Sequence, residues 1–339
     1  MFKYNWLLSD GYPQKGVENH NKKVFGTFLC GGGSSMGYKL AGFNHLGGVE
    51  IDPEMANLYK VNHNPKYLYN EDIRIFLERN DLPNELFDLD ILDGSPPCTT
   101  FSTAGKREDT WGVNKVFKEG QSKQVLDDLV FVYVDLINKL QPKVALLENV
   151  SGIIKGNAKA YSKEIVRKLS SFGYETQVFL LNASTMGVPQ KRQRVFFIAK
   201  RKDLKLPKLT LNFNEKEIPY GEIEEEFGHK KIQGEKTLFY WKKVKPGDKF
   251  ATVHPTGSWF NVVKLHKKKV VGTITTKIDN IFTHHSKPYL ISNNEIIKAG
   301  TFPLDYNFLN VKPVYPVGMS VPPVMTAQIA YQIYLQLLK

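Results

Sequence analysis

Residues 24–33 read Val-Phe-Gly-Thr-Phe-Leu-Cys-Gly-Gly-Gly, an apolar run that ends in three consecutive glycines. An apolar run of this length, bounded by glycine, predicts a buried strand over residues 24–29. Residues 34–42 then predict a helix that ends at a glycine. Glycines between a strand and a helix let the backbone approach a ligand closely, and the helix start offers free N–H groups. The stretch therefore predicts a ligand-binding turn at the beginning of an α/β domain.

The alternation of strand and helix continues through the first 200 residues. Strands alternating with helices predict an α/β fold with a mostly parallel sheet that is covered on both faces. The connection 183–191 is too short for a helical crossover, so we expect one antiparallel strand near the sheet edge. The further strands are predicted at 46–50, from Leu68, at 87–92, 143–147, 176–182 and 194–200, and the helices through about His63, at 124–140 and at 161–172.

Composition changes after Lys200, which predicts a second, smaller and irregular domain. Residues 201–288 are rich in Lys, Gly, Pro and Asn, with short β-like runs at 236–241 and 272–277. Residues 321–338 have a helical period and are expected to return to the first domain. We therefore divide the chain into segments 1–200, 201–288 and 289–339.

The charge of the chain favours a polyanionic partner. The 46 Lys and Arg residues exceed the 34 Asp and Glu residues, which gives a net charge of +12 and a pI of about 9.3. Residues 200–289 alone hold 19 basic and 10 acidic residues. Nucleic acid is the usual partner of such a chain, and a solvated lysine-rich surface is the alternative.

The cysteine count excludes several classes of protein. The chain has two cysteines, Cys30 and Cys98, too few for a disulfide framework or a four-cysteine zinc site. No apolar run approaches the ~20 residues of a membrane helix, and the N-terminus lacks the apolar stretch of a signal peptide. We expect a cytoplasmic protein with one functional thiol, no membrane partner and no metal.

Two segments at predicted strand ends could carry chemistry. Asp93-Gly-Ser-Pro-Pro-Cys98 follows the fourth strand, and ligands of parallel sheets gather at the carboxyl ends of the strands. Its two prolines hold the thiol in one direction, whereas a structural cysteine usually lies inside an element. Glu50 ends the second strand, where a carboxylate can accept hydrogen bonds from both ribose hydroxyls of a nucleoside cofactor. Asp72 is a weaker acidic candidate of the same kind.

Two further segments bring a carboxylate and two guanidiniums. Glu148-Asn149-Val150 ends a buried strand, and burial would raise the pKa of the glutamate, which suits a group that shares a proton. A helix cap or half of an ion pair is the alternative. Arg192 and Arg194 alternate, so in an extended segment both point to one face and favour a phosphate or carboxylate. A solvated basic turn is the alternative there.

In this order and spacing, the four segments resemble the cytosine-5 DNA methyltransferase family of bacterial or phage type. Pro-Pro-Cys, Glu-Asn-Val and Gln-x-Arg-x-Arg match its most specific motifs, and residues 292–308 and 318–321 match its C-terminal ones. The resemblance covers nearly the whole chain except residues 201–270. Cys30 and Met319 depart from the family pattern, in which a glycine and an asparagine are usual.

The resemblance implies an S-adenosylmethionine-dependent Rossmann-like sheet, mostly parallel with one antiparallel strand, over residues 1–200. Residues 201–288 would form a target recognition domain, and residues 289–339 would return to the catalytic domain. It also implies S-adenosylmethionine as cofactor, double-stranded DNA as substrate and a monomer. The setting would be a restriction-modification system with a separate endonuclease, or an orphan or phage methylation system.

The resemblance also assigns roles to single residues. Cys98 would attack C6 of cytosine, Glu148 would contact N3 and the amino group, Arg194 would steady the carbonyl oxygen, and Arg192 would support it or a phosphate. The residues implied for the cofactor are Phe28, Leu29, Gly31, Gly32, Gly33, Glu50, Ile51, Asp72, Ile73, Ser95, Pro97, Leu129, Ser320 and Val321. Those implied for DNA are Lys106, Arg107 and Lys115 in a mobile loop over 99–120, and Lys242, Lys243, Thr275 and Lys277. The aromatics Tyr240, Trp241 and Trp259 are expected to face the groove.

The sequence also bears on four other functions. An RNA methyltransferase with two catalytic cysteines is disfavoured, because the second thiol, Cys30, lies in the predicted cofactor loop. A tRNA cytosine methyltransferase that uses one cysteine stays open. A nicotinamide dehydrogenase is disfavoured, since Met36 stands where the third glycine of G-x-G-x-x-G would be. A catalytically silent DNA-binding relative is opposed by the presence of Cys98, Glu148 and Arg194.

Overall fold

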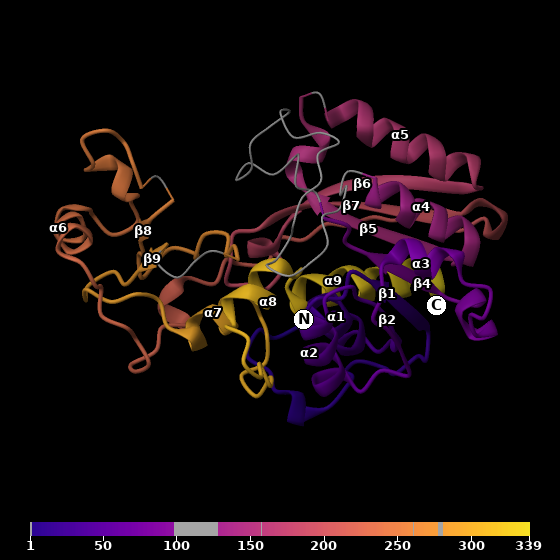
Figure 1. Ribbon diagram of the computed structural model, residues 1–339, viewed down its shortest axis with the longest axis horizontal. Coiled ribbons are helices and arrows are strands. Elements are labelled where there is room, and N and C mark those ends of the chain that lie inside the picture. Colours follow the sequence, from indigo (N-terminus) through magenta and orange to yellow (C-terminus); the bar gives the residue numbers. More distant parts are fainter. Residues whose placement is uncertain (1, 98–127, 157, 260, 277–280) are drawn as a thin grey trace. The chain divides into compact units, whose positions relative to one another are not determined.

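The computed structural model describes residues 2–97, 128–156, 158–259, 261–276 and 281–339 (Figure 1). The chain forms two compact units that interleave in sequence. The first, here called the sheet unit, consists of Tyr12–Leu181, Gln193–Asn212 and Ile329–Lys339. The second unit consists of Met1–Gly11, Asn182–Arg192 and Phe213–Gln328. The division into domains 1–200, 201–288 and 289–339 stays a prediction.

A seven-stranded sheet organises the sheet unit, in the order β3-β2-β1-β4-β5-β7-β6. The pairs β1–β2, β1–β4, β2–β3 and β4–β5 are parallel, whereas β5 and β7 are antiparallel. The predicted mostly parallel sheet and its antiparallel strand near the edge are therefore confirmed. The strands are β1 (Lys23–Thr27), β2 (Asn44–Val49), β3 (Tyr67–Tyr69), β4 (Ile91–Gly94), β5 (Val144–Val150), β6 (Tyr174–Asn182) and β7 (Gln193–Arg201).

Helices cover both faces of the sheet. On one face α3 (Ile73–Glu78), α4 (Leu129–Leu140) and α5 (Ala158–Ser171) lie side by side (Figure 1). They bury the main apolar core, which includes Leu92 of β4 and Tyr133 of α4. The next residue, Asp93, points to the opposite face, where Tyr38 of α1 (Gly33–Leu40) contacts it.

Aspartates begin two of the helices that follow strands. The side chain of Asp52 accepts hydrogen bonds from the backbone N–H groups of Glu54 and Met55 and so caps α2 (Pro53–His63). Asp72 caps α3 in the same way through the N–H of Arg74. These caps fix where the chain turns away from the carboxyl ends of β2 and β3.

The second unit has few regular elements in the part of it that the structure describes. They are the helices α6 (Glu235–Lys243), α7 (Asn293–Ala299) and α8 (Val314–Met319) and the short parallel pair β8 (Val263–Lys264) and β9 (Phe282–Thr283). Most of α9 (Pro323–Ile333) also belongs to this unit, and α9 continues as a short π-helix (Tyr334–Leu338). Short 3-10 turns in the two units are Leu8–Asp10, Asn84–Phe87, Ser151–Ile154, Ala183–Thr185, Lys202–Leu204, Tyr220–Glu222 and Phe250–Thr252. No helix of the described residues could cross a membrane.

Three expectations about secondary structure are wrong. Residues 236–241 form helix α6 and not a strand, because the helical period buries Tyr240 and Trp241 together against Phe250. Residues 272–276 form no strand, since the N–H of Ile274 donates to the side chain of Gln190. The fourth strand begins at Ile91 and not at residue 87, because a 3-10 turn precedes it.

Gly47 allows β2 and β3 to approach each other. Its φ is +125°, and a Cβ atom there would lie 1.8 Å from the carbonyl oxygen of Tyr67. Gly173 also has a positive φ, +88°, but a Cβ atom would meet nothing within 4 Å. A side chain at Gly173 would therefore meet backbone strain alone, whereas a side chain at Gly47 would meet both strain and steric overlap with Tyr67.

We predict that Gly47→Ala is more destabilising than its matched control Gly173→Ala. The control should lose about 1 kcal/mol through its left-handed φ. Gly47→Ala should lose roughly 1–3 kcal/mol more, because Tyr67 must move. Urea unfolding followed by circular dichroism measures both, and equal losses would contradict the packing argument.

Candidate catalytic and cofactor site

The glycine-containing loop after β1 has an unusual backbone that Glu50 holds in place. Phe28, Cys30 and Gly32 have φ angles of 58°, 46° and 75°. One carboxylate oxygen of Glu50 accepts the N–H of Cys30 at 2.7 Å, and the other accepts the N–H of Asp52 at 2.8 Å. Burial raises the pKa of Glu50, and these backbone hydrogen bonds oppose the rise. The binding of ribose hydroxyls by Glu50 stays a prediction.

The ring of His63 packs against Gly32 of this loop, a contact that the sequence did not predict. A Cβ atom on Gly32 would lie 2.1 Å from Nε2 of His63, so no side chain fits there. The ring stacks on Tyr59 with centroids 4.3 Å apart, and Nζ of Lys39 lies 3.5 Å from its Nδ1. Burial lowers the pKa of Lys39 to about 8. No local signal links these residues to the glycines, because they meet only in the fold.

The other predicted cofactor residues of the sheet unit follow its parallel strands. Phe28, Ser95 and Pro97 are half-buried, Leu29 and Leu129 are buried, and Ile51 is exposed. Asp72 caps α3 and pairs with Arg74 at 3.0 Å, while Ile73 is part of the core. Ser320 and Val321 are buried in or beside the end of α8, in the second unit. Their binding roles stay predictions.

Glu148 and Arg194 form a buried ion pair at the end of β5. Nε of Arg194 lies 2.8 Å from Oε1 of Glu148. The antiparallel register places Arg194 opposite Val150, and Glu148 lies two residues away on the same face of the sheet. Burial lowers the pKa of Arg194, and the carboxylate opposes this change. Both residues were candidates from the sequence, and the alternative of an ion pair for Glu148 is what the structure shows.

Asn149 joins the end of β5 to the Pro-Pro turn. Its side-chain amide donates to the carbonyl oxygen of Pro96 at 3.3 Å, and its oxygen accepts the N–H of Val150. The turn that carries the Pro-Pro-Cys motif is therefore tied to the strand that carries Glu148. Cys98 and the whole loop 99–120 with Lys106, Arg107 and Lys115 lie outside the described residues, as does Lys277, so their roles stay predictions.

Asp93 is a second buried carboxyl group on the face of the sheet that carries Glu148. It pairs in register with Leu146, two residues before Glu148, and its Oδ1 accepts the hydroxyl of Tyr38 at 3.1 Å. Burial raises the pKa of Asp93 to about 7, and the charge of Glu148 adds to the rise. The motif contained Asp93, but only its burial distinguishes it from an ordinary strand-end aspartate.

The family model for C-5 cytosine-specific DNA methylases matches residues 23–335. The chain belongs to this family. It is therefore a DNA cytosine-5 methyltransferase by family, as the Pro-Pro-Cys, Glu-Asn-Val and Gln-x-Arg-x-Arg motifs indicated.

Curated relatives and solved structures are similar to this methylase. It is 26% identical over 327 residues to the type II methyltransferase M1.HphI of Haemophilus parahaemolyticus, which covers 89% of this chain and 84% of the relative. It is 34% identical over 207 residues to M.DdeI of Desulfomicrobium norvegicum, which covers 60% of this chain and 46% of the relative. The match thus spans about half of the second relative's length.

Among solved structures, a DNA modification methyltransferase candidate encoded within an E. coli prophage gives a TM-score of 0.69 at 19% identity, covering 93% of this chain and 99% of that chain. A mutant of Spodoptera frugiperda DNMT2 gives 0.62 at 18% identity, covering 93% and 100%. These two likenesses concern the fold, which is the Rossmann-like sheet of S-adenosylmethionine-dependent methyltransferases.

In the second unit of the methylase, Arg192 serves the backbone. Its NH1 donates to the carbonyl oxygen of Ile274 at 2.8 Å and its NH2 to that of Gly318 at 2.9 Å. The side chain is buried. These two carbonyl contacts give Arg192 a structural role. Its part in the chemistry stays a prediction.

The predicted DNA contacts of the methylase differ in exposure. Lys242, Lys243 and Thr275 are exposed. The expectation that Tyr240 and Trp241 face a groove is wrong, because both are buried in a small core with Val244 and Phe250. Nε1 of Trp241 donates to the carbonyl oxygen of His284 at 3.1 Å. These two aromatics hold α6 in place.

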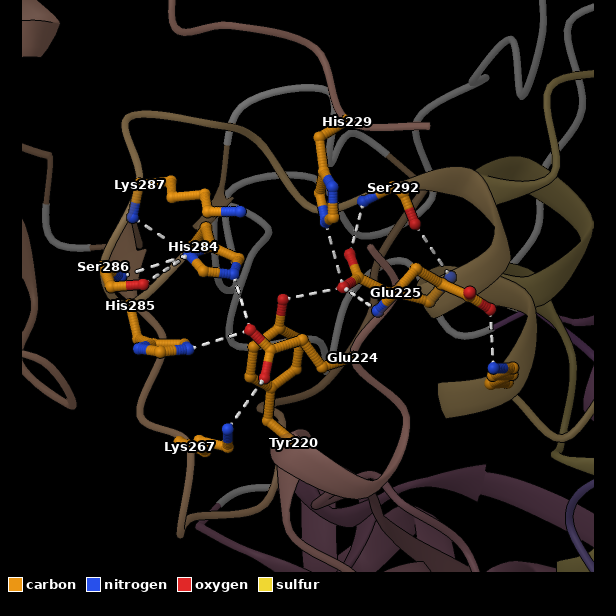
Figure 2. A network of polar contacts seen from close by, with 12 residues as sticks. Tyr220, Glu224, Glu225, His229, Lys267, His284, His285, Ser286, Lys287 and Ser292 are labelled. Atoms are coloured by element: carbon orange, nitrogen blue, oxygen red, sulfur yellow. Dashed lines mark hydrogen bonds and ion pairs between the residues drawn. The ribbon is translucent and has the colours of Figure 1, made fainter. Parts of the chain in front are cut away.

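Glu224, His284 and His285 bring three potential metal ligands within 4.8 Å of one another (Figure 2). The Nδ1 atom of His284, however, accepts the N–H groups of Ser286 and Lys287 at 3.1 and 3.0 Å. Its Nε2 must then carry the proton, which it donates to Glu224 at 2.7 Å. A metal would need that nitrogen unprotonated, so the geometry fits a hydrogen-bond network.

A buried glutamate extends the network shown in Figure 2. Glu295 accepts hydrogen bonds from the hydroxyl of Tyr220 at 2.7 Å, from the N–H of Glu225 at 3.0 Å and from the N–H of Ser292 at 2.7 Å, and it pairs with His229 at 3.1 Å. These contacts join segments that are 60–75 residues apart in sequence.

We predict that acid destabilises the second unit. Burial lowers the pKa of His284, and its hydrogen bond to Glu224 offsets this only in part. The folded chain therefore favours the neutral ring, whereas the unfolded ring takes up a proton near pH 6.5. Stability should be full above that pH and fall below it. Burial alone would raise the pKa of Glu224, but the hydrogen bonds from His285 and His284 lower it, so protonation of Glu224 acts in the same direction at still lower pH.

Urea unfolding followed by tryptophan fluorescence, between about pH 5 and pH 8, measures this dependence. His284→Gln should flatten it, because the variant cannot protonate at that position. His254→Gln, a histidine of the same unit outside the network, is the matched control. An unchanged pH dependence in His284→Gln would contradict the assignment.

Proposed function

We propose that this chain transfers a methyl group from S-adenosylmethionine to C5 of cytosine in double-stranded DNA, through a covalent bond between Cys98 and C6. The observation that carries the proposal is the buried Glu148–Arg194 pair beside the anchored Pro96-Pro97 turn. Membership of the C-5 cytosine-specific DNA methylase family supports it. Type II methyltransferases among the relatives favour a restriction-modification system, with an orphan or phage system as the alternative.

The chemistry explains why a thiol is needed. C5 of cytosine is a weak nucleophile, so a direct attack on a methyl donor is slow. When the thiolate of Cys98 adds to C6, an S–C6 bond forms and the electron pair of the C5–C6 double bond makes C5 nucleophilic. After methylation, a base removes the proton of C5, the double bond re-forms and Cys98 leaves. Covalent catalysis thereby divides one difficult step into easier ones.

Glu148 and Arg194 act on the charge that develops in the ring. Glu148 contacts N3 and the amino group, and Arg194 contacts the carbonyl oxygen. Both side chains are fixed in the low-dielectric end of β5 and β7, where oriented charges stabilise a developing charge most. Arg192 supports the contact of Arg194 with the base or binds a phosphate.

The residues after the parallel strands fit S-adenosylmethionine, which supplies an electrophilic methyl group on a sulfonium. Glu50 accepts hydrogen bonds from the ribose hydroxyls. Phe28 stacks on the adenine, and Asp72 with Ile73 bounds its edge. The remaining contacts of the proposal are Leu29, Gly31, Gly32, Gly33, Ile51, Ser95, Pro97, Leu129, Ser320 and Val321.

The cytosine must leave the duplex before Cys98 can reach C6. Lys106, Arg107 and Lys115 contact phosphates around the extruded base, and their charges make binding depend on salt. Lys242, Lys243, Thr275 and Lys277 contact the duplex from the second unit. A tRNA substrate for the same mechanism is the second candidate, which direct comparison of the two nucleic acids decides.

We predict that the protein labels duplex DNA and not tRNA when it is given radiolabelled S-adenosylmethionine. Cys98→Ser should keep cofactor and DNA binding and lose methyl transfer. A duplex containing 5-fluorocytosine should trap the wild type as a denaturant-stable adduct, since fluorine cannot leave as the C5 proton does. Cys30→Ser, the matched thiol control, should still form the adduct. An adduct with Cys98→Ser would overturn the mechanism, and labelling of tRNA alone would change the substrate.

We predict that Glu148→Gln slows single-turnover methyl transfer by about 10²–10³-fold, the usual cost of removing one oriented group from a developing charge. The amide is almost isosteric, but it leaves Arg194 without its charged partner, at a cost of roughly 3–5 kcal/mol. Urea unfolding therefore first establishes that the variant is folded at the assay temperature. Glu164→Gln on the exposed face of α5 is the matched control. Rapid-quench measurement with saturating DNA tests this, and a wild-type rate would remove Glu148 from the chemistry.

A further inference from the structure

Helix α6 of the second unit has one exposed face on which a phenylalanine lies between lysines. Lys236, Phe239 and Lys243 recur at positions i, i+3 and i+7, so they share a side of the helix. Phe239 is 51% exposed although it is a large apolar residue. Nζ of Lys243 lies 4.0 Å from the centroid of its ring. The face therefore combines an apolar surface with positive charge.

The opposite side of α6 is firmly anchored. Tyr240 and Trp241 pack with Val244 and Phe250 in a small core. Nζ of Lys264 donates to the carbonyl oxygens of Trp241 and Val244 at 3.0 and 3.2 Å. Phe239 meets the ring of Tyr240 edge-on, with centroids 5.2 Å apart, but it is not part of this core and half of its surface is exposed.

The lysines of α6, and two lysines just after it, have no acidic partner among the described residues. Within the described residues, no ion pair is formed by Lys236, Lys242, Lys243, Lys245 or Lys249. Lysines of the sheet unit, in contrast, include Lys23, Lys143 and Lys168, each paired with an aspartate. Unpaired cations around one exposed aromatic ring fit a polyanion that also offers apolar atoms, which describes nucleic acid. Protein interfaces are depleted in lysine, which disfavours a protein partner.

We propose that α6 enters the major groove of the DNA substrate, with Phe239 against base edges and Lys236 and Lys243 on phosphates that flank the groove. This rests on the proposed function, because it takes duplex DNA as the substrate. It assigns part of the sequence preference to Phe239, whose ring can contact the methyl group of thymine.

The dimensions of the helix agree with those of the groove. Seven residues separate Lys236 from Lys243, which corresponds to about 10.5 Å along the helix axis. The major groove of B-form DNA is about 12 Å wide and admits an α-helix. A helix that lies in the groove has its axis along the groove, so the two lysines are separated along it, and each can reach a phosphate of the flanking backbone while Phe239, between them, faces the bases.

The test uses the full chain and a library of fluorescein-labelled duplexes with a randomised centre, so that binding is measured without methylation. Lys236→Ala/Lys243→Ala should reduce the slope of log affinity against log salt concentration by about 2, because two phosphate contacts are lost. Phe239→Ala should leave that slope unchanged and reduce the preference for the selected sequence by roughly 5- to 150-fold, the usual range for one base contact.

Matched controls separate this role from folding. Phe227→Ala removes a phenylalanine of the same unit that is 81% exposed, and Lys159→Ala/Lys163→Ala removes two exposed lysines of α5. Urea midpoints close to that of the wild type show that each variant is folded. If Phe239→Ala matches Phe227→Ala in sequence preference, or if the two lysine pairs have the same salt slope, the proposal is overturned.

Failure of the proposed function and failure of the α6 proposal give different results. A wild type that selects sequences in the library but forms no 5-methylcytosine refutes the proposed function and leaves the α6 proposal standing. A wild type that binds no duplex, or binds tRNA more tightly than its selected duplex, overturns the α6 proposal. The α6 proposal is also overturned if a second protein covers α6 and its binding does not compete with that of DNA.

Discussion

The sheet unit depends on keeping the charges of Glu148 and Arg194 together inside it. Burying two ions is expensive, and leaving one of them alone costs roughly 3–5 kcal/mol, so such a pair needs strict positioning. The antiparallel pairing of β5 with β7 supplies it, because Arg194 enters opposite Val150 and beside Glu148. A parallel β7 would run in the other direction. The antiparallel pairing of β7 with β5 is therefore what brings the guanidinium of Arg194 to the end of β5.

Three buried carboxyl groups of this unit have different hydrogen-bond and ion-pair partners. Glu50 accepts backbone N–H groups, Glu148 pairs with Arg194, and Asp93 accepts a tyrosine hydroxyl. Of the three, Glu148 has a cationic partner, whereas burial raises the pKa of Glu50 and raises that of Asp93 to about 7. Glu50, which orients the loop, and Glu148, at the end of β5, thus have separate partners.

The sequence predicted what local patterns determine. Apolar runs marked most of the strands, the residues at their ends marked Glu50 and Glu148, and the alternation of Arg192 and Arg194 marked the two guanidiniums. It did not predict α6, because Leu-Phe-Tyr-Trp has high β propensity and only packing against Phe250 decides for the helix. Nor could it predict that His63 fills the space under Gly32, or that Arg192 donates to carbonyls 82 and 126 residues away.

The second unit shows why prediction fails most there. Its chain has few regular elements, so backbone groups that a sheet would pair need side-chain partners. His284 accepts the N–H groups of Ser286 and Lys287, and Glu295 accepts those of Glu225 and Ser292. Such partners come from residues distant in sequence and leave no periodic pattern. The fold of this unit is therefore held by scattered side-chain contacts, while a large residue such as Phe239 stays half-exposed.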